Sequence, residues 1–405
     1  MKLKIFSCHK NYIQRGSQAF TEVTIALFLA GFSTFSLLYC VQPILFLFSK
    51  EFSLSPVQSS LFLSAPTAMM SIGMLFAGPL SDSIGRKVVM STSLFLASFL
   101  TFFCSGMSTW ENIVLMRALT GLALSGVASV AMTYLSEEMH PGILSFSIGL
   151  YISGNTIGGF AGRFLSSLLC EYFSWNVALE FISFLAFAFS ILFVFLLPTS
   201  KNFSSVNLNF RHIVSNFLRQ WKHPVTSKLF CMGCLLMGSF ITIFSYIGYR
   251  LILKPFYFNQ TSIGLLSVIY LIGVYSSPQA GILIRKYKKS IILITALMMM
   301  IFGILVTQWN TMFLVILGLI LFSAGFYAAH SVTSTWISQQ SKESKGSTSS
   351  IYLFSYYLGS SVFGTVSGIF WSVGEWLGIS IFVISFLLIG IFFAMKLLKY
   401  QKTII

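Results

Sequence analysis

Residues 78–87, which read GPLSDSIGRK, place an acid, two bases and two glycines inside a long apolar run. Asp82 is the only aspartate of the chain and lies four residues before Arg86. A carboxylate accepts hydrogen bonds from guanidinium groups and from the free N–H groups of a helix start. Gly78 and Gly85 allow close helix approach and a tight turn. These residues therefore suit electrostatic contacts between segments.

Other chemistry is not indicated by the sequence. It holds no phosphate-binding glycine loop, no clustered His, Cys and carboxylate ligand set and no nucleophile with a base. We therefore expect no metal, no cofactor and no enzyme. A membrane-embedded enzyme is a remote alternative, because Asp82 and Glu137 lack catalytic companions. A channel is a weaker alternative, because no re-entrant filter segment is visible.

The composition requires lipid around most of the chain. Only 9% of the 405 residues are charged and 56% are hydrophobic, whereas soluble domains carry about 25% charged residues. The net charge of +15 comes from short basic clusters between long apolar runs. That distribution is typical of membrane topology and argues against nucleic-acid binding.

The apolar runs predict about twelve membrane-spanning helices, since a span needs about 20 residues. The fold class is therefore an all-α membrane protein with two six-helix bundles. The spans are expected at residues 20–48, 57–80, 88–107, 112–136, 143–169, 175–198, 228–254, 262–284, 290–307, 311–338, 346–371 and 376–397.

The basic residues predict the orientation. With both termini in the cytoplasm, 20 of the 25 lysines and arginines are cytoplasmic. Only Lys50 and Lys254 lie outside, and Arg117, Arg163 and Arg250 lie within or at the edges of spans. This asymmetry follows the rule that cytoplasmic loops are rich in bases. The chain is thus expected to be a multi-pass protein of the inner (plasma) membrane.

The chain also divides into two similar halves. "AGPLSDSIGRK" at 77–87 aligns with "AGILIRKYKKS" at 280–290. A parallel repeat of six spans is typical of transporters with a two-fold axis along the membrane normal. The expected divisions are a cytoplasmic segment 1–19, a bundle 20–198, a cytoplasmic linker 199–227, a bundle 228–397 and a cytoplasmic tail 398–405.

These motifs resemble those of the major facilitator superfamily. The family signature between spans two and three is matched by Gly78, Leu80, Asp82, Gly85, Arg86 and Lys87. Span four carries Arg117, and span five carries GNTIGG, which is similar to the twelve-helix drug:proton antiporter branch. Asn155 stands where that branch has Pro. The segments LYCVQPIL and SGNTIGG also resemble sugar-efflux permeases.

The resemblance implies alternating access and gives residues 78–87 a function. Asp82 is expected to accept hydrogen bonds from the start of span eleven, near residues 345–347. Arg86 or Lys87 is expected to meet Glu137 or Glu138 at the end of span four. Such a latch would favour the outward-facing state. A plain basic loop that only sets topology is the alternative.

Charged groups within the spans are candidates for function. Arg117 is expected to orient an anionic group or to influence a proton-carrying site, with snorkelling to the membrane edge as the alternative. Arg163 and Glu180 are expected to form a structural ion pair. His330 is a candidate for proton exchange, because its ordinary pKa lies near neutral pH; a packing role is the alternative.

Uncharged residues complete the prediction. Gly154, Gly158, Gly159 and Gly162 give span five a face for close helix packing, with a hinge as the alternative. An aromatic, mildly polar cavity is expected to be lined by Tyr39, Gln42, Tyr246, Tyr249 and Tyr356, any of which could instead anchor a span at the interface.

These observations lead to a predicted function. We expect a monomeric secondary transporter that exports a small amphipathic or sugar-like solute in exchange for protons. A uniporter or nutrient importer on the same fold is the alternative.

Overall fold

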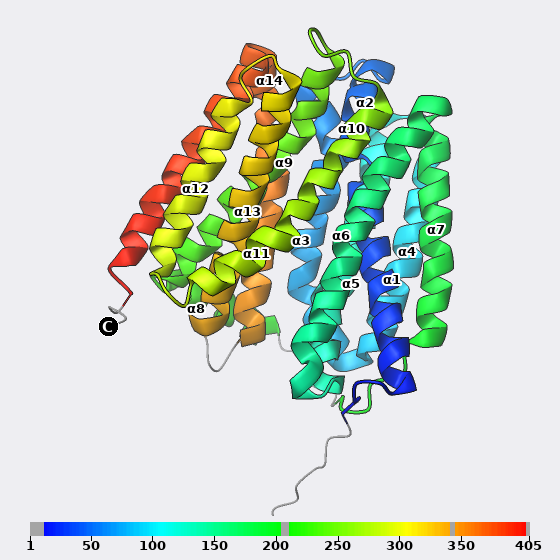
Figure 1. The fold of residues 1–405 in the computed structure, drawn as a ribbon. Coiled ribbons are helices and arrows are strands. Elements are labelled where there is room, and N and C mark those ends of the chain that lie inside the picture. The colour runs from blue at the N-terminus through cyan, green and yellow to red at the C-terminus, as the bar shows by residue number, and fades with distance from the viewer. Residues whose placement is uncertain (1–11, 204–209, 341–344, 402–405) are drawn as a thin grey trace, which may run out of the picture.

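The computed structural model describes residues 12–203, 210–340 and 345–401. Its helices form two bundles that stand side by side (Figure 1). The first bundle consists of α1 (Gln18–Tyr39), η1 (Gln42–Ile44), α2 (Leu45–Glu51), α3 (Pro56–Ile84), α4 (Arg86–Ser105), α5 (Trp110–Glu138), α6 (Pro141–Tyr172) and α7 (Trp175–Leu196). The connecting segment contains α8 (Phe210–Lys222). The second bundle consists of α9 (Thr226–Ile252), α10 (Gln260–Leu265), η2 (Leu266–Leu271), α11 (Ile272–Leu283), α12 (Lys289–Val306), α13 (Met312–Gln340) and α14 (Lys345–Leu398).

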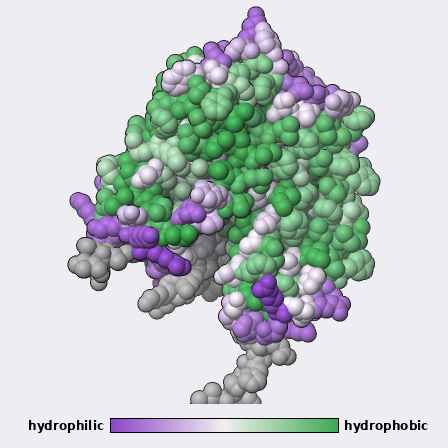
Figure 2. Space-filling view, viewed as in Figure 1, coloured by the Kyte–Doolittle hydropathy of each residue, from purple (hydrophilic) through white to green (hydrophobic). Residues whose placement is uncertain are grey.

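Eleven helical segments of the described chain are long and apolar enough to cross a membrane. The last of them contains two of the predicted spans, because α14 turns at Gly374 and Glu375, whose backbone angles are not helical. The helices therefore confirm the predicted fold class, with twelve crossings in two bundles. The surface is apolar around the middle and hydrophilic toward both ends, as expected of a protein surrounded by lipid (Figure 2).

The two ends of the molecule differ in how the bundles meet. Both ends of the described chain lie at one end, here called the termini face, and the opposite end is called the distal face (Figure 1). The ribbons of the two bundles come together at the distal face and diverge toward the termini face. Helix starts at the distal face have sequence-encoded caps, such as Ser55, whose hydroxyl accepts a hydrogen bond from Gln58 N–H while the Gln58 side chain accepts from Ser55 N–H.

Residues 78–87 do not form the predicted loop. The helix α3 continues to Ile84, and α4 begins at Arg86, so a single residue separates them. Gly85 adopts a φ of 104°, which only glycine reaches at little cost. Gly78 has no neighbour within 4 Å of the position of a Cβ. Gly85 thus makes the expected tight turn, while Gly78 makes no close helix contact in this conformation.

The glycines of α6 face α1. A Cβ at Gly154, Gly158 or Gly162 would lie 2.2–2.7 Å from backbone atoms of α1. Gly159 is placed differently: its carbonyl accepts a hydrogen bond from Arg163 Nη1 at 2.7 Å. The four-residue spacing therefore brings two backbones together along several turns, and it also fixes the rotation of α6 about its axis.

Candidate functional site

Aromatic and hydroxyl groups close the distal face between the bundles. Tyr249 Oη lies 2.7 Å from Ser59 Oγ and donates to the carbonyl of Leu45 at 3.1 Å. Tyr246 Oη donates to the carbonyl of Pro56 at 3.2 Å. Both tyrosines also pack against Trp371, with centroid distances of 5.6 and 5.5 Å. We call these contacts the distal seal.

The distal seal corrects the prediction for two residues. Tyr246 and Tyr249 were expected to line a cavity, but they are 1% and 4% exposed and their hydroxyls bind the first bundle. Sequence periodicity places them on an inward face of α9 but does not say whether that face meets a cavity or the other bundle. In this conformation it meets the other bundle.

A carboxylate reinforces the closure of the distal face. Glu171, near the end of α6, accepts hydrogen bonds from the backbone N–H of Thr261 at 2.7 Å and from Asn259 Nδ2 at 3.0 Å. Asn259 caps α10, whose first turn carries Thr261. Beside them, Gln260 Nε2 donates to the carbonyl of Pro43 at 2.7 Å. An acid of the first bundle thus holds a helix start of the second.

Arg163 lies beneath these contacts and is 5% exposed. Its Nε donates to Gln42 Oε1 at 2.7 Å, and Gln42 Nε2 donates in turn to Ser245 Oγ of α9 at 3.3 Å. The guanidinium carbon lies 4.3 Å from the ring centroid of Tyr39 and 4.7 Å from that of Tyr270. Arg163 is therefore placed where side chains from both bundles meet.

The predicted ion pair between Arg163 and Glu180 is not formed. Glu180 is on an exposed face of α7, and its carboxylate is 3.5 Å from Ser105 Oγ of α4. The glycine face of α6 turns Arg163 toward α1 and η1 instead. Similar depth on consecutive spans was the basis of the prediction, and depth does not determine helix rotation.

A small cavity adjoins Arg163. Its volume is about 20 Å³, which is room for about one water molecule. The cavity is lined by Gln42, Pro43, Arg163, Phe244, Ile247, Ile263, Leu266, Ser267 and Tyr270. Tyr39 is close by, and its buried hydroxyl has no hydrogen-bond partner among the described residues. Gln42 thus lines this cavity, and Tyr39 lies close to it across the guanidinium of Arg163.

Arg117 is fully buried and joins the end of α1 to α3. Its guanidinium donates to the carbonyls of Leu37 and Leu38 at 2.9 and 2.8 Å, and to the carbonyl of Phe62 at 3.3 Å. Leu37 and Leu38 are in the last turn of α1, where carbonyls lack helical partners. The geometry gives Arg117 a capping role instead of the expected role toward an anionic group.

His330 belongs to an aromatic cluster on α13 and α14. Its Nδ1 lies 2.8 Å from Tyr352 Oη, and its ring lies 4.8 Å from that of Tyr356 and 6.0 Å from that of Phe326. Tyr356 is partly exposed and is the predicted cavity residue nearest to His330. The cluster gives His330 one polar partner.

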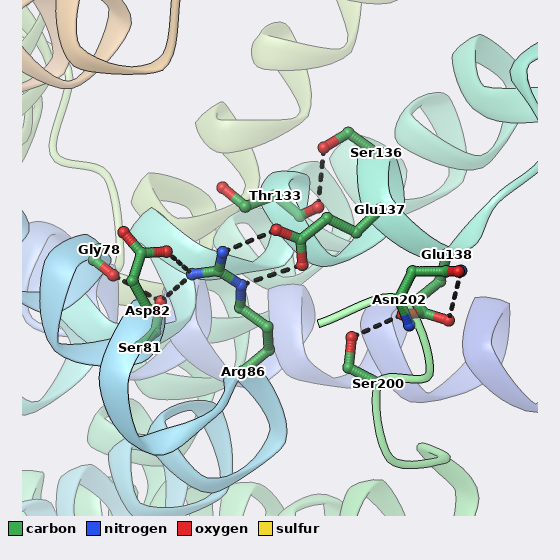
Figure 3. Close-up of polar contacts among 10 residues, drawn as sticks. All are labelled: Gly78, Ser81, Asp82, Arg86, Thr133, Ser136, Glu137, Glu138, Ser200 and Asn202. Atoms are coloured by element: carbon green, nitrogen blue, oxygen red, sulfur yellow. Dashed lines mark hydrogen bonds and ion pairs between the residues drawn. The ribbon is translucent and has the colours of Figure 1, made fainter. Parts of the chain in front are cut away.

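At the termini face, Arg86 joins three helix ends (Figure 3). It forms ion pairs with Asp82 and with Glu137, whose two oxygens accept from Arg86 Nη2 at 2.7 Å and Nε at 3.1 Å. Glu138 instead accepts from Ser200 Oγ at 2.6 Å and from the backbone of Asn202 at 2.8 Å. The predicted approach of a motif base to an acid of span four is therefore present through Arg86 and Glu137.

The remaining part of the predicted latch involves Asp82, Lys87 and the start of span eleven. Asp82 pairs with Arg86 of the next helix, and Lys87 makes no ion pair within the described residues. The side chains of residues 345–347, toward which Asp82 was expected to point, lie outside the part of the chain that the structure describes. The contact between Asp82 and the start of span eleven therefore stays a prediction.

Sequence reasoning missed Glu171, Ser59 and Tyr270. A signal existed for Glu171, which is an acid near the end of a span. Asn259 is a typical cap residue at a helix start in the other half of the chain, and such a helix start can bind an acid. No signal pairs Ser59 with Tyr249, since the contact depends on how the bundles meet.

Comparisons with known proteins agree with this architecture. The profile of the Major Facilitator Superfamily matches residues 25–363. A Buchnera aphidicola (subsp. Baizongia pistaciae) protein described as an uncharacterized transporter is 75% identical over 99% of this chain and 100% of its own. The Escherichia coli inner membrane transport protein YnfM is 49% identical over 95% of this chain and 93% of its own. A bacterial homologue of the human lysosomal transporter Spinster, solved inward-facing and unoccupied, superposes with a TM-score of 0.78 at 14% identity, covering 96% and 99% of the two chains.

Proposed function

The chain belongs to the major facilitator superfamily, and we propose that it exports a small amphipathic or sugar-like solute across the inner membrane in exchange for protons. The coarser function, a multi-pass membrane transporter, follows from the family and its transporter relatives. The direction of transport, the coupling ion and the drug:proton or sugar-efflux branch belong to the proposal. So do the monomeric state and the division into working units at residues 20–198 and 228–397.

The observation that supports alternating access in this proposal is the one-sided contact between the bundles. Where both partners are described, every hydrogen bond between the bundles lies in the distal half of the molecule, as in the distal seal and at Glu171. A carrier that alternates must hold one side closed by contacts weak enough to break. A few hydrogen bonds and stacked rings meet that requirement, because each contributes only about 0.5–1.5 kcal/mol net.

We assign the coupling proton to His330 in this proposal. The ordinary pKa of histidine lies near neutral pH, and the imidazole has a hydroxyl partner at Tyr352. Uniport or import is the second candidate. One observation favours it: the acids of the described spans lie within about two turns of a span end or at the bend of α14, as Glu22 and Glu180 do.

Purified protein in liposomes that contain a trapped pH dye tests the proposal. A panel of neutral sugars, amphipathic amines and carboxylates is added under an imposed pH gradient, with protein-free liposomes as control. Export with coupling predicts that at least one solute moves in the direction opposite to protons and stops when a protonophore collapses the gradient. Solute movement without proton movement would support uniport, and movement of protons in the same direction as solute would support import.

The proposed orientation places the termini face in the cytoplasm. Thr109 at the distal face and Lys286 at the termini face are both exposed. A membrane-impermeant thiol reagent added to intact cells should label Thr109→Cys and spare Lys286→Cys. The opposite pattern would reverse the orientation.

A further inference from the structure

Arg163 is a buried cation without a carboxylate partner. Both ion pairs within the described residues belong to Arg86, so no acid neutralises Arg163. Its Nε and Nη1 donate to Gln42 and to the Gly159 carbonyl, while Nη2 makes no hydrogen bond to a described residue. A guanidinium has five N–H donors in a planar fork that fits a carboxylate. One edge of the fork is thus available.

The other buried arginines differ in this respect. Arg117 donates from all three of its nitrogens to backbone carbonyls, two in the last turn of α1 and that of Phe62 within α3, whose usual helical donor is replaced by Pro66. Arg250 likewise serves the carbonyls at the end of α12, among them that of Trp309 at 3.3 Å. Their function is capping. Arg163 contacts one carbonyl of its own helix, one neutral amide and two aromatic rings, and a charge held in this way within a membrane is a functional candidate.

A second, independent observation points to a ligand at the same place. The hydroxyl of Tyr39 is buried and has no hydrogen-bond partner among the described residues, which costs about 1–3 kcal/mol unless a partner is supplied. The Tyr39 ring lies on the guanidinium of Arg163 at 4.3 Å, so the free donor and the cation belong to one site. Tyr270, from the other bundle, covers the guanidinium at 4.7 Å.

Resting on the proposed function, we propose that Arg163 binds the carboxylate of an organic anion, with the Tyr39 hydroxyl as a second donor. The rings of Tyr39 and Tyr270 then favour an anion with a flat or apolar body, since aromatic faces contact such groups well. The cavity beside Arg163 holds only about one water molecule. Binding therefore has to separate Tyr39 from Tyr270, which lie on opposite bundles, and so links occupancy to bundle movement.

Thermal unfolding of the purified protein in detergent tests this site with sodium benzoate as the probe. A ligand that binds the folded state raises the melting temperature with its concentration. Benzoate should raise it and its neutral isostere benzamide should not. Tyr39→Phe, which removes a hydroxyl without a described partner, should weaken benzoate binding about tenfold. Arg163→Gln should abolish the benzoate effect, and Arg163→Lys should restore part of it.

Arg250→Lys is the matched control, because it changes a buried arginine whose hydrogen bonds go to the carbonyls after α12 and to Asn310. It lowers the melting temperature at most and leaves the benzoate effect intact. The site would be overturned if benzoate raised the melting temperature equally in the wild type and in Arg163→Gln, or if benzamide raised it as much as benzoate. It would also be overturned if none of the three carboxylates benzoate, acetate and succinate changed the melting temperature. If Arg163→Gln does not yield folded protein, the benzoate effect on Tyr39→Phe tests the site, and an effect equal to that on the wild type would overturn it.

The outcome for the site is separable from that of the proposed function. Benzoate that binds through Arg163 but never crosses vesicles, together with no transported solute in the panel, would sustain the site and contradict export. Transport of neutral solutes that Arg163→Gln leaves unchanged would sustain transport and overturn the site.

Discussion

The carboxylate of Glu171 accepts a hydrogen bond at 2.7 Å from the backbone N–H of Thr261, across the boundary between the bundles. Asn259, the cap of the same helix start, donates to the other carboxylate oxygen. The partial positive charge of a helix start stabilises an acid placed there. This contact at the distal face is the same type of interaction that the sequence predicts for Asp82 at the termini face, and we predict that the two acids favour opposite states.

Glu171→Gln should favour opening of the distal face. The amide keeps the size of the side chain but loses its charge, and a contact of this kind at an exposed helix start contributes about 0.3–1 kcal/mol. The population open at the distal face should rise roughly two- to fivefold. Labelling of a cysteine placed at Ser245, which is buried beneath the distal seal, measures that population. Glu111→Gln, an acid in the first turn of α5, is the control, and equal labelling in the two variants would remove Glu171 from the closure.

Gly158→Ala should destabilise the first bundle. A Cβ at this position would lie 2.2 Å from the backbone oxygen of Phe32, so α1 and α6 have to separate. Overpacking of this kind costs roughly 1–3 kcal/mol. Gly149→Ala on the same helix is the matched control, because nothing lies within 4 Å of its Cβ position. A melting temperature in detergent that falls equally in both variants would show that the contact with α1 is not the cause.

Asp82→Asn should slow transport while expression stays near normal. In the present conformation Arg86 keeps its two hydrogen bonds to Glu137, so the helix ends remain joined. The variant loses the predicted contact with the start of α14, worth roughly 0.3–2 kcal/mol, in the state closed at the termini face. Thiol labelling should rise at the termini face and fall at the distal face. Normal transport with an unchanged labelling ratio would leave residues 78–87 as a topology signal only.

His330→Gln should remove the dependence of transport on the pH gradient while solute exchange continues. Glutamine keeps a polar contact with Tyr352 but does not titrate near neutral pH. His140→Gln at the start of α6, outside the aromatic cluster, is the control. Proton movement in liposomes with a trapped dye gives the measurement. A gradient dependence that survives in His330→Gln would assign His330 to packing.

The sequence predicts the spans well because their signal is local. Hydrophobic length gives each crossing, and the final pair is recovered as two spans because the chain turns between them at Gly374 and Glu375. The helix ends are predicted less accurately, since residues 81–84, beyond the predicted span end at residue 80, continue α3 as far as Ile84. Only Gly85 interrupts the helix, and a single positive φ was enough to make the turn.

The candidate site is predicted less well because it depends on helix rotation and on the conformational state. Arg163 and Glu180 match in depth but face different neighbours. Tyr246 and Tyr249 lie on an inward face, but their contacts with Pro56 and Leu45 arise from one arrangement of the bundles. Such contacts are not encoded by periodicity along one helix.

Cross-linking across the distal face tests alternating access most directly. The double variant Glu171→Cys, Thr261→Cys is made in a background without the six native cysteines, one of which is Cys170 beside the site. A bifunctional methanethiosulfonate should join the two positions and stop transport of the solute found in the liposome screen. Reduction of the cross-link should restore that transport. Each single variant, treated in the same way, should keep transporting. A complete cross-link with undiminished transport would contradict the account, because the distal face would not need to open.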